Sequence, residues 1–181
     1  MNLWKIDPVH SEINFKVKHL VVSTVAGHFD KFDATIETGK EDFSDAKISF
    51  EADVKSINTK NEQRDAHLKS ADFFDAEKYP KLSFVSMAVK KLSDYELQVN
   101  GRLSLRGVTK DVVLHVMYNG TVAGFGGVQV AGFEIQGKLN RFDFGLQWNA
   151  LTEAGGVVVS NEVKIEILAE FNKVQQAAKA A

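Results

Sequence analysis

The sequence predicts an all-β protein, an extended eight-stranded antiparallel β-barrel with one short helical insertion. Apolar and polar side chains alternate along most of the 181 residues, which is typical of strands with one solvated face. Helical patterns are scarce, and none has an apolar stripe wide enough to cover a sheet. A sheet with one apolar face and no covering helix closes on itself or pairs with a second sheet. A barrel is therefore expected, with a β-sandwich as the alternative.

The predicted strands follow one another along the chain, and each places every second side chain in the interior. The inward positions are Ile13, Phe15 and Val17; Val25, Gly27 and Phe29; Phe32, Ala34 and Ile36; Ile48, Phe50, Ala52 and Val54; Tyr95 to Leu105; Leu114 and its neighbours in Asp111–Tyr118; Ala131, Phe133, Ile135, Gly137 and Leu139; and Val163 to Phe171. Near Asp30–Lys31 the inward positions change from odd-numbered to even-numbered residues, which indicates a β-bulge and a bend. The inward positions also change after Phe84, where Val85, Met87 and Val89 become the inward set.

Turn residues separate the strands, and one segment favours a helix. Turns are expected at Thr38–Asp42, Ser93–Asp94, Arg106–Gly107, Asn119–Gly120 and Gly124–Gly127. A helix is expected over Lys60–Ser70, with Thr59 and Glu62 forming a capping box. It belongs to a long insertion, residues 58–80, between two strands. We expect a single domain over residues 1–172 and a flexible or frayed C-terminal tail over residues 173–181.

The inner face of the predicted barrel carries small residues among large ones. Gly27, Ala34, Ala52, Gly101, Ala131, Gly137 and Ala169 all fall in the inward phase. One interpretation is an elongated apolar cavity, and the other is a filled barrel whose glycines mark bends. The cavity interpretation predicts a wall made of Phe15, Val17, Phe29, Phe32, Phe50, Ala52, Leu97, Val99, Gly101, Leu114, Phe133, Ile135 and Ile165.

Composition and motifs exclude several classes of function. The chain has no cysteine and a formal charge of −2, so thiolate chemistry is excluded and a nucleic-acid partner is not expected. No apolar run is long enough for a transmembrane helix. Residues 132–138 match the start of a P-loop, but they alternate as a strand and lack the Ser or Thr that follows. The five histidines show no zinc spacing, so no metal and no cofactor are expected, although a barrel can bring distant histidines together.

Four polar residues are candidates for contacting the polar end of a ligand: His10, Arg64, His67 and Arg141. Arginine suits phosphate because its planar guanidinium donates paired hydrogen bonds. The insertion that carries Arg64 and His67 also carries Phe73 and Phe74, so it is expected either to plug one end of the barrel or to form a lid. The alternative role for Arg141 is a structural ion pair with Asp143 or Asp65.

Short segments in order along the chain resemble the YceI-like family of bacterial lipid-binding proteins. These segments are Trp4–Ser11, Phe15–Leu20, Gly27–Phe29, Ser56–Ile57, Arg64–Leu68, Asp72–Asp75, Tyr79–Pro80, Gly101–Leu103, Arg106–Lys110 and Arg141–Gly145. The resemblance implies a lipocalin-like barrel, an internal apolar pocket for an isoprenoid or similar long-chain amphiphile, and often a homodimer. It carries over no set of catalytic residues.

Two classes of function remain from the sequence. The first is a protein that sequesters or carries a polyprenyl phosphate, quinone or fatty-acid derivative inside the barrel. The second is an enzyme that acts on the head group at the barrel mouth through His10, His67 or an arginine. The first is favoured, because no nucleophile and base are found in a recognisable pattern. Residues 1–7 show no signal-peptide core, so a cytoplasmic location is expected, or a periplasmic one if a signal has been removed.

Overall fold

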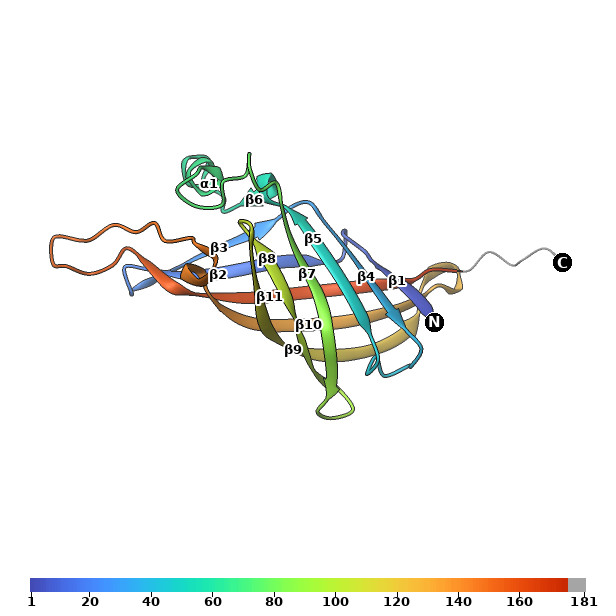
Figure 1. The fold of residues 1–181 in the computed structure, drawn as a ribbon. Coiled ribbons are helices and arrows are strands. Elements are labelled where there is room, and N and C mark those ends of the chain that lie inside the picture. The colour runs from blue at the N-terminus through green and yellow to red at the C-terminus, as the bar shows by residue number, and fades with distance from the viewer. Residues whose placement is uncertain (176–181) are drawn as a thin grey trace.

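The computed structural model describes residues 1–175, which form a strongly curved antiparallel sheet and one helix (Figure 1). The strands are β1 (Asn2–Ile6), β2 (Glu12–His19), β3 (Ser23–Phe29), β4 (Phe32–Thr38), β5 (Lys47–Asp53), β6 (Ile57–Asn58), β7 (Lys81–Lys91), β8 (Glu96–Leu105), β9 (Val108–Ala123), β10 (Gln129–Asn140) and β11 (Val159–Lys173). The helix is α1 (Glu62–Lys69), and short 3-10 turns follow β5 at Val54–Ser56 and β10 at Arg141–Phe144. Residues 176–181, most of the tail expected from the sequence, lie outside the described residues.

The sheet closes because β11 pairs with three strands. Along its length it pairs with β10, and its other edge pairs first with β2, from Val159 to Leu168, and then with β1, from Phe171 to Lys173. The Asp7 N–H donates to the Glu170 carbonyl at 2.8 Å, which bridges the gap between β1 and β2. The ring runs β1, β4, β5, β7, β8, β9, β10, β11 and back to β1. The predicted eight-stranded barrel is therefore confirmed, and the sandwich alternative is excluded.

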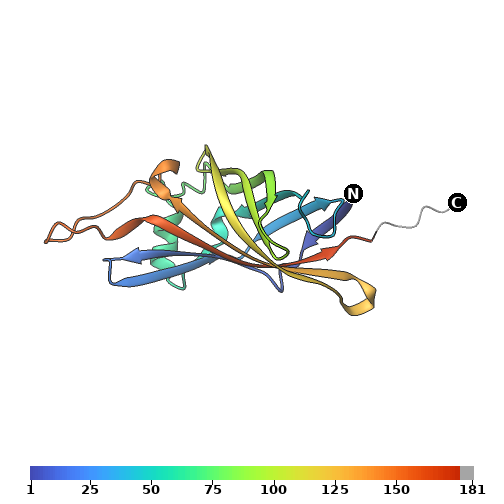
Figure 2. The same cartoon turned by 90° about the horizontal axis from the view of Figure 1, so that it is seen from below.

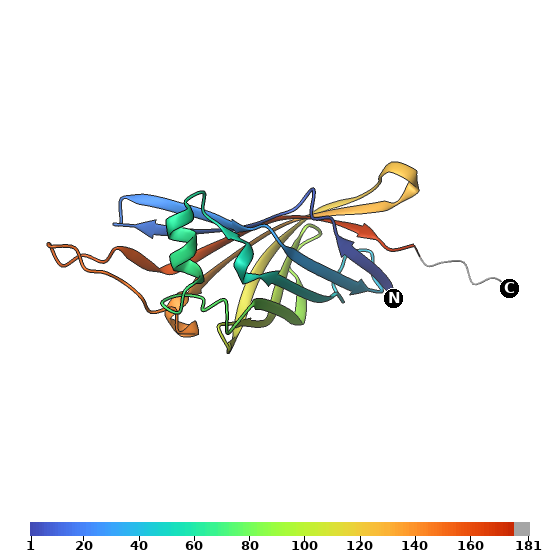
Figure 3. The same ribbon diagram turned by 90° about the horizontal axis from the view of Figure 1, so that it is seen from above.

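The predicted bend at Asp30–Lys31 separates β3 from β4, and it gives the barrel two different ends. Before the bend, β3 pairs with β2 and is not part of the closed ring of strands. After the bend, β4 pairs with β1 and is part of that ring. The hairpin of β2 and β3 therefore projects from one end of the barrel, beside α1 (Figures 1 and 3). The view from below shows the same elongated shape, with the connection between β9 and β10 at the opposite end (Figure 2).

Two other irregularities differ from the sequence-based prediction. In β7 the register shifts between Ser86 and Ala88 rather than after Phe84, so Val85 and Met87 are exposed and only Val89 turns inward. Asn119–Gly120 is not a turn: β9 continues to Ala123, and the register with β10 slips there while Gly120 adopts a φ of 108°. Glycine tolerates that φ inside a strand, and the chain reverses later, at Gly124–Gly127.

Helix α1 is shorter than expected, and the capping-box prediction is wrong. The N-cap is Asn61, whose side-chain oxygen accepts the Arg64 N–H at 2.9 Å. Lys60 has a φ of 60°, which is incompatible with a helix that includes it. Thr59 binds Asp65 instead of Glu62: its N–H and its hydroxyl both donate to Oδ1 of Asp65, at 2.9 and 2.5 Å. As expected from the missing apolar stripe, α1 buries none of its residues.

The interior is made by the inward phase of the strands. Phe15, Phe50, Leu97, Phe133 and Ile165 all face it, and His115 lies on the exposed outer face as predicted. Within residues 1–175, no helix has both the length and the apolar character needed to cross a membrane.

Candidate functional site

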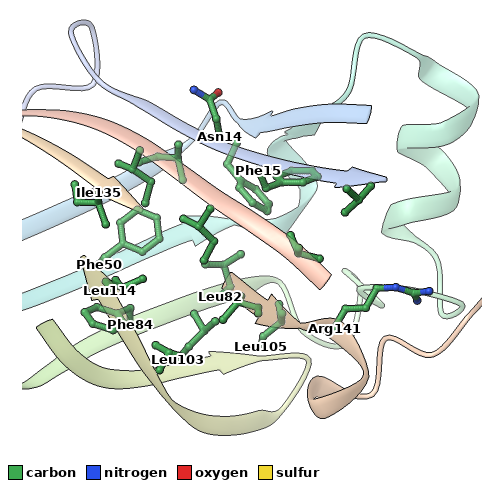
Figure 4. Close-up of a pocket in the computed structure, with 18 of the residues that line it drawn as sticks. Asn14, Phe15, Phe50, Leu82, Phe84, Leu103, Leu105, Leu114, Ile135 and Arg141 are labelled. Atoms are coloured by element: carbon green, nitrogen blue, oxygen red, sulfur yellow. The ribbon is translucent and has the colours of Figure 1, made fainter. Parts of the chain in front are cut away.

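The barrel encloses a cavity of about 740 Å³, within the range of roughly 300–1,000 Å³ that is usual for ligand pockets. Figure 4 shows Phe15, Phe50, Leu114 and Ile135 projecting from four different strands into the same space, with Arg141 at the end nearest α1. Polar side chains contribute to the lining mainly around that end: Lys18 and His19 at the end of β2, the segment from Thr59 to His67, and Arg141. Elsewhere the wall is almost wholly apolar.

Most of the wall residues predicted from the sequence line this cavity. They are Phe15, Val17, Phe29, Phe50, Leu97, Val99, Leu114, Phe133, Ile135 and Ile165. Phe32, Ala52 and Gly101 do not. Ala52 lies between its cross-strand partners Phe32 and Leu82 and is completely covered, and Gly101 lies beneath the ring of Phe84.

The cavity does not arise from the inward glycines, contrary to the sequence interpretation. A Cβ atom at Gly101 would lie 2.5 Å from Cε2 of Phe84, and one at Gly27 would lie 2.9 Å from Cε1 of Phe15. The rings of Phe84 and Phe15, on the neighbouring strands, extend over these glycines and fill the space that the missing side chains leave. Ala34 and Ala169 do line the cavity. The open volume is therefore not the space left by Gly27 and Gly101, because aromatic rings cover the backbone at both positions.

One end of the cavity is closed by Phe43, from the connection between β4 and β5. Phe43 is buried and has a φ of 57°. Its ring centroid lies 5.3 Å from that of Trp4, 5.2 Å from that of Tyr118 and 5.0 Å from that of Phe133, so it contacts opposite walls. Asp45 fixes the loop by accepting hydrogen bonds from the Thr38 hydroxyl and from the N–H of Gly39 and Lys40. No alternating pattern in the sequence indicates this plug.

The other end opens beneath α1, where exposed residues take part in the lining. Arg64 is exposed at this mouth, and its Nε and Nη2 donate to the hydroxyl and carbonyl of Thr59, both at 2.8 Å. Within residues 1–175, its Nη1 makes no hydrogen bond. Arg64 is thus held in place at the opening with part of its guanidinium available.

The insertion lies over the mouth and is packed onto the barrel by its two phenylalanines. Phe73 is buried and Phe74 packs edge-on against Phe29, with ring centroids 6.3 Å apart, so this pair seats the insertion on the barrel. His67 lies at the rim, where its Nε2 is 2.8 Å from Oδ2 of Asp72. Its ring packs edge-on against the ring of Trp148, with the two ring centroids 4.8 Å apart. The segment is therefore a fixed partial cover over the mouth.

Arg141 lines the cavity, but its hydrogen bonds hold the fold. It is 4% exposed and donates to four backbone carbonyls, those of Leu146, Trp148, Val159 and Ser160. Neither Asp143 nor Asp65 pairs with it, so the predicted ion pair is wrong. The pKa of Arg141 is lowered because burial disfavours its charge.

These bonds position Trp148, a mouth residue that the sequence analysis missed. Its segment, residues 145–158, has no alternating pattern, and a lone tryptophan in an irregular segment was its only signal. Arg106, also missed, donates to the carbonyls of Gly145 and Ala71 at 3.1 and 2.9 Å, which ties this segment to the insertion.

His10 lies outside the cavity, so the structure does not bring it to the mouth with the other candidates. Its Nδ1 lies 3.0 Å from Oδ2 of Asp7 and 3.8 Å from Oε1 of Glu170 on the outer wall. The hydrogen bond with Asp7 raises the pKa of His10 and lowers that of Asp7. Among residues 1–175, these three side chains form a group of potential metal ligands, and their hydrogen bond and ion pairs account for the arrangement.

The fold and the cavity define a class: a lipocalin-like barrel with an apolar interior, closed at one end and partly covered at the other. The YceI-like domain matches residues 4–171, and the chain belongs to that family, as the resemblance indicated. The UPF0312 protein SAS2572 of Staphylococcus aureus is 40% identical, with 95% of this chain and 98% of the relative covered.

Solved structures agree with this assignment. The YCEI protein of Campylobacter jejuni is 31% identical, covers 87% of this chain and 90% of its own, and superposes with a TM-score of 0.76. A polyisoprenoid binding domain from Saccharophagus degradans shares the fold, with a TM-score of 0.64 at 17% identity and coverage of 94% and 98%.

Proposed function

We propose that the protein binds one long-chain isoprenoid or similar amphiphile, with its hydrocarbon chain in the cavity and its polar end at the mouth. The observation that carries this proposal is the distribution of polarity: an apolar cavity plugged by Phe43, with polar lining residues concentrated around the opening. The Saccharophagus degradans neighbour described as polyisoprenoid binding supports the same class of ligand. Such a protein would sequester the lipid from water or carry it.

The shape of the cavity favours a chain over a compact polar ligand. Burial of each CH₂ group contributes about 0.8 kcal/mol, so a long chain gains affinity along the whole wall. A phosphate buried deep among Phe50, Val99 and Ile135 would lose its hydration without hydrogen-bonding partners, which is costly. The polar end is therefore expected to stay at the opening, beneath α1.

Arg64 is the residue that we assign to an anionic head group. Thr59 holds two of its nitrogen atoms and leaves Nη1 available within the described chain. Arg141 is the weaker candidate, because four carbonyl groups already occupy most of its donors. His67 lies at the same rim and is positioned by Asp72.

Fluorescence provides the test, because the chain has two tryptophans and only Trp148 lines the cavity. In a Trp4→Phe background, Trp148 reports on ligand entering the mouth. Geranylgeranyl pyrophosphate and geranylgeraniol share one hydrocarbon chain and differ in charge. Both should bind. Arg64→Ala should weaken the pyrophosphate about ten- to a hundredfold, because a charge-assisted hydrogen bond is lost, and should leave the alcohol unchanged.

Arg102→Ala is the matched control, since Arg102 is an exposed arginine on the outer wall, 3.6 Å from Asp111. It should change neither affinity. Failure of both ligands to bind would refute the proposal. Equal losses for both ligands in Arg64→Ala would show that Arg64 supports the fold around the mouth and does not contact the head group.

A second candidate function is hydrolysis at the mouth, favoured by the contact between His67 and Asp72. A carboxylate behind an imidazole is typical of a general base. Within residues 1–175, no hydroxyl group is hydrogen-bonded to the His67 ring, so the nucleophile in such a reaction would be a water molecule that His67 deprotonates. Mass spectrometry of the titration mixtures tests this alternative directly: release of phosphate or pyrophosphate that is abolished by His67→Gln would establish it.

A further inference from the structure

Two loop tips at the mouth carry exposed apolar side chains. The turn between β2 and β3 presents Leu20, Val21 and Val22, of which Val21 and Val22 are 78% and 85% exposed. Beside it, the segment from Leu151 to Val157 forms a small hairpin, closed by a bridge between these two residues, with Leu151 74% exposed. We call residues 20–22 and 151–157 the mouth tips. Both project beyond the barrel at the end where α1 lies (Figures 1 and 3).

The mouth tips are joined to each other and are continuous with the cavity wall. The Leu20 N–H donates to the Val158 carbonyl at 2.9 Å. Val158, and Val17 and Val25 in the hairpin that carries the first tip, line the cavity. An apolar path therefore runs from the projecting tips into the barrel.

The conformation of the first tip is unfavourable for the residues that occupy it. Leu20 and Val21 have φ values of 51° and 64°, a region in which a hairpin turn favours asparagine and glycine. A β-branched residue there is uncommon, and strained backbone of this kind is concentrated at functional sites. The strained backbone at Val21 holds an apolar side chain that is 78% exposed to water.

We propose that the mouth tips insert into the surface of a lipid bilayer, so that a hydrocarbon chain passes between the membrane and the cavity without crossing water. This inference rests on the function proposed above. A lipid surface fits better than a second copy of the chain, because stable protein interfaces use about 20–30 residues on each side, whereas two narrow tips expose only a few apolar side chains. The only charged residue of the mouth tips is Glu153, so the attraction is apolar, not electrostatic.

Co-sedimentation with vesicles tests the proposal on the full chain without ligand. Wild-type protein should bind phosphatidylcholine vesicles and vesicles containing phosphatidylglycerol to a similar extent, with little change at high salt, because apolar insertion is not screened. A double variant, Leu20→Asn with Val21→Gly, removes two of the three apolar side chains of the first tip and relieves the backbone strain, so it should remain folded. It should lower the vesicle partition coefficient at least tenfold, and Leu151→Asp should act in the same direction.

Phe125→Asp is the matched control, because Phe125 is a fully exposed apolar residue at the opposite end of the barrel. It should bind vesicles like the wild type. Absence of vesicle binding, an equal loss in the Phe125 variant, or binding that requires anionic lipid and disappears with salt would each overturn the proposal. So would a wild-type dimer that the tip variants dissociate while vesicle binding is unchanged, since the tips would then contact a second copy.

Detergent-solubilised geranylgeraniol separates this inference from the proposed function. The tip variants should bind it with wild-type affinity, measured through Trp148, but should take it up from vesicles at least tenfold more slowly. If the wild type binds the solubilised alcohol and no vesicles, membrane docking is wrong and lipid binding stands. If it binds vesicles but neither the alcohol nor the pyrophosphate, the proposed function is wrong.

Discussion

Three glycines in strands allow the packing of the barrel wall to be tested with one substitution, glycine to alanine. At Gly101 a new Cβ atom would lie 2.5 Å from Cε2 of Phe84 and 2.6 Å from the carbonyl oxygen of Val85. The backbone oxygen cannot move away, so the clash persists. At Gly137 the only close atom is Cδ2 of Leu114, at 2.6 Å.

Leu114 borders the open cavity, so its side chain has space into which it can move. At Gly132, on the outer face, the nearest atom would be Cβ of Asn119 at 3.6 Å, an ordinary contact. None of the three glycines has a positive φ, so alanine itself introduces no backbone strain. The three sites therefore differ only in what the added methyl group meets.

The expected changes in the free energy of unfolding follow from these contacts. Replacing a strand glycine by alanine contributes about 0.5–1 kcal/mol of stability, and overpacking costs about 1–3 kcal/mol. Gly132→Ala should stabilise the protein by about 0.5–1 kcal/mol. Gly137→Ala should be near neutral, and Gly101→Ala should be destabilised by up to about 2 kcal/mol.

Equilibrium unfolding in urea measures the three differences, with an unchanged m-value showing that the same two states are compared. Gly137→Ala should also weaken geranylgeraniol binding, because Leu114 is displaced into the cavity. A Gly101→Ala variant as stable as the Gly137→Ala variant would refute the account of how Phe84 covers the wall.

Other parts of the barrel give further predictions. Arg141→Met should destabilise the fold by roughly 3–5 kcal/mol, because buried carbonyls lose their donor, and should red-shift the emission of Trp148. Phe43→Ala should lower the free energy of unfolding by about 3–5 kcal/mol and lengthen the cavity, so that longer prenols gain affinity relative to geranylgeraniol; an unchanged chain-length preference would contradict the plug. The pKa of His10 is raised above 6.5 and that of Asp7 is lowered below 3.8, so their contact stabilises the fold between these values and is lost as the pH rises through the pKa of His10 or falls through that of Asp7. The difference in melting temperature between wild type and His10→Gln should therefore shrink from pH 5 to pH 9, and a constant difference would contradict this reasoning.

The sequence alone determined the strands and their inward faces because alternation is a local property. Each strand's inward set, such as Leu97, Val99 and Leu103, can be assigned from neighbours two residues apart. The absence of a covering helix left either a closed barrel or a sandwich, and the pairing of β11 with both β10 and β1 decided for the barrel. The bend at Asp30–Lys31 could also be assigned from the change of phase, although the structure has a break between β3 and β4 there and not the expected bulge within one strand. The wall of the cavity followed from the same pattern.

The tertiary structure alone decided where the wall is open and what its ends are made of. Phe84 covers Gly101 because of strand register, which a single strand's pattern does not contain. Phe43 and Trp148 reach the cavity from irregular segments, where no periodicity indicates which way a side chain points. Arg141 was predicted to meet an anion or a carboxylate, yet it binds four carbonyls. Those carbonyls lie between 5 and 19 residues further along the chain, in a loop and at the beginning of β11. Only the folded chain brings their dipoles around one guanidinium group.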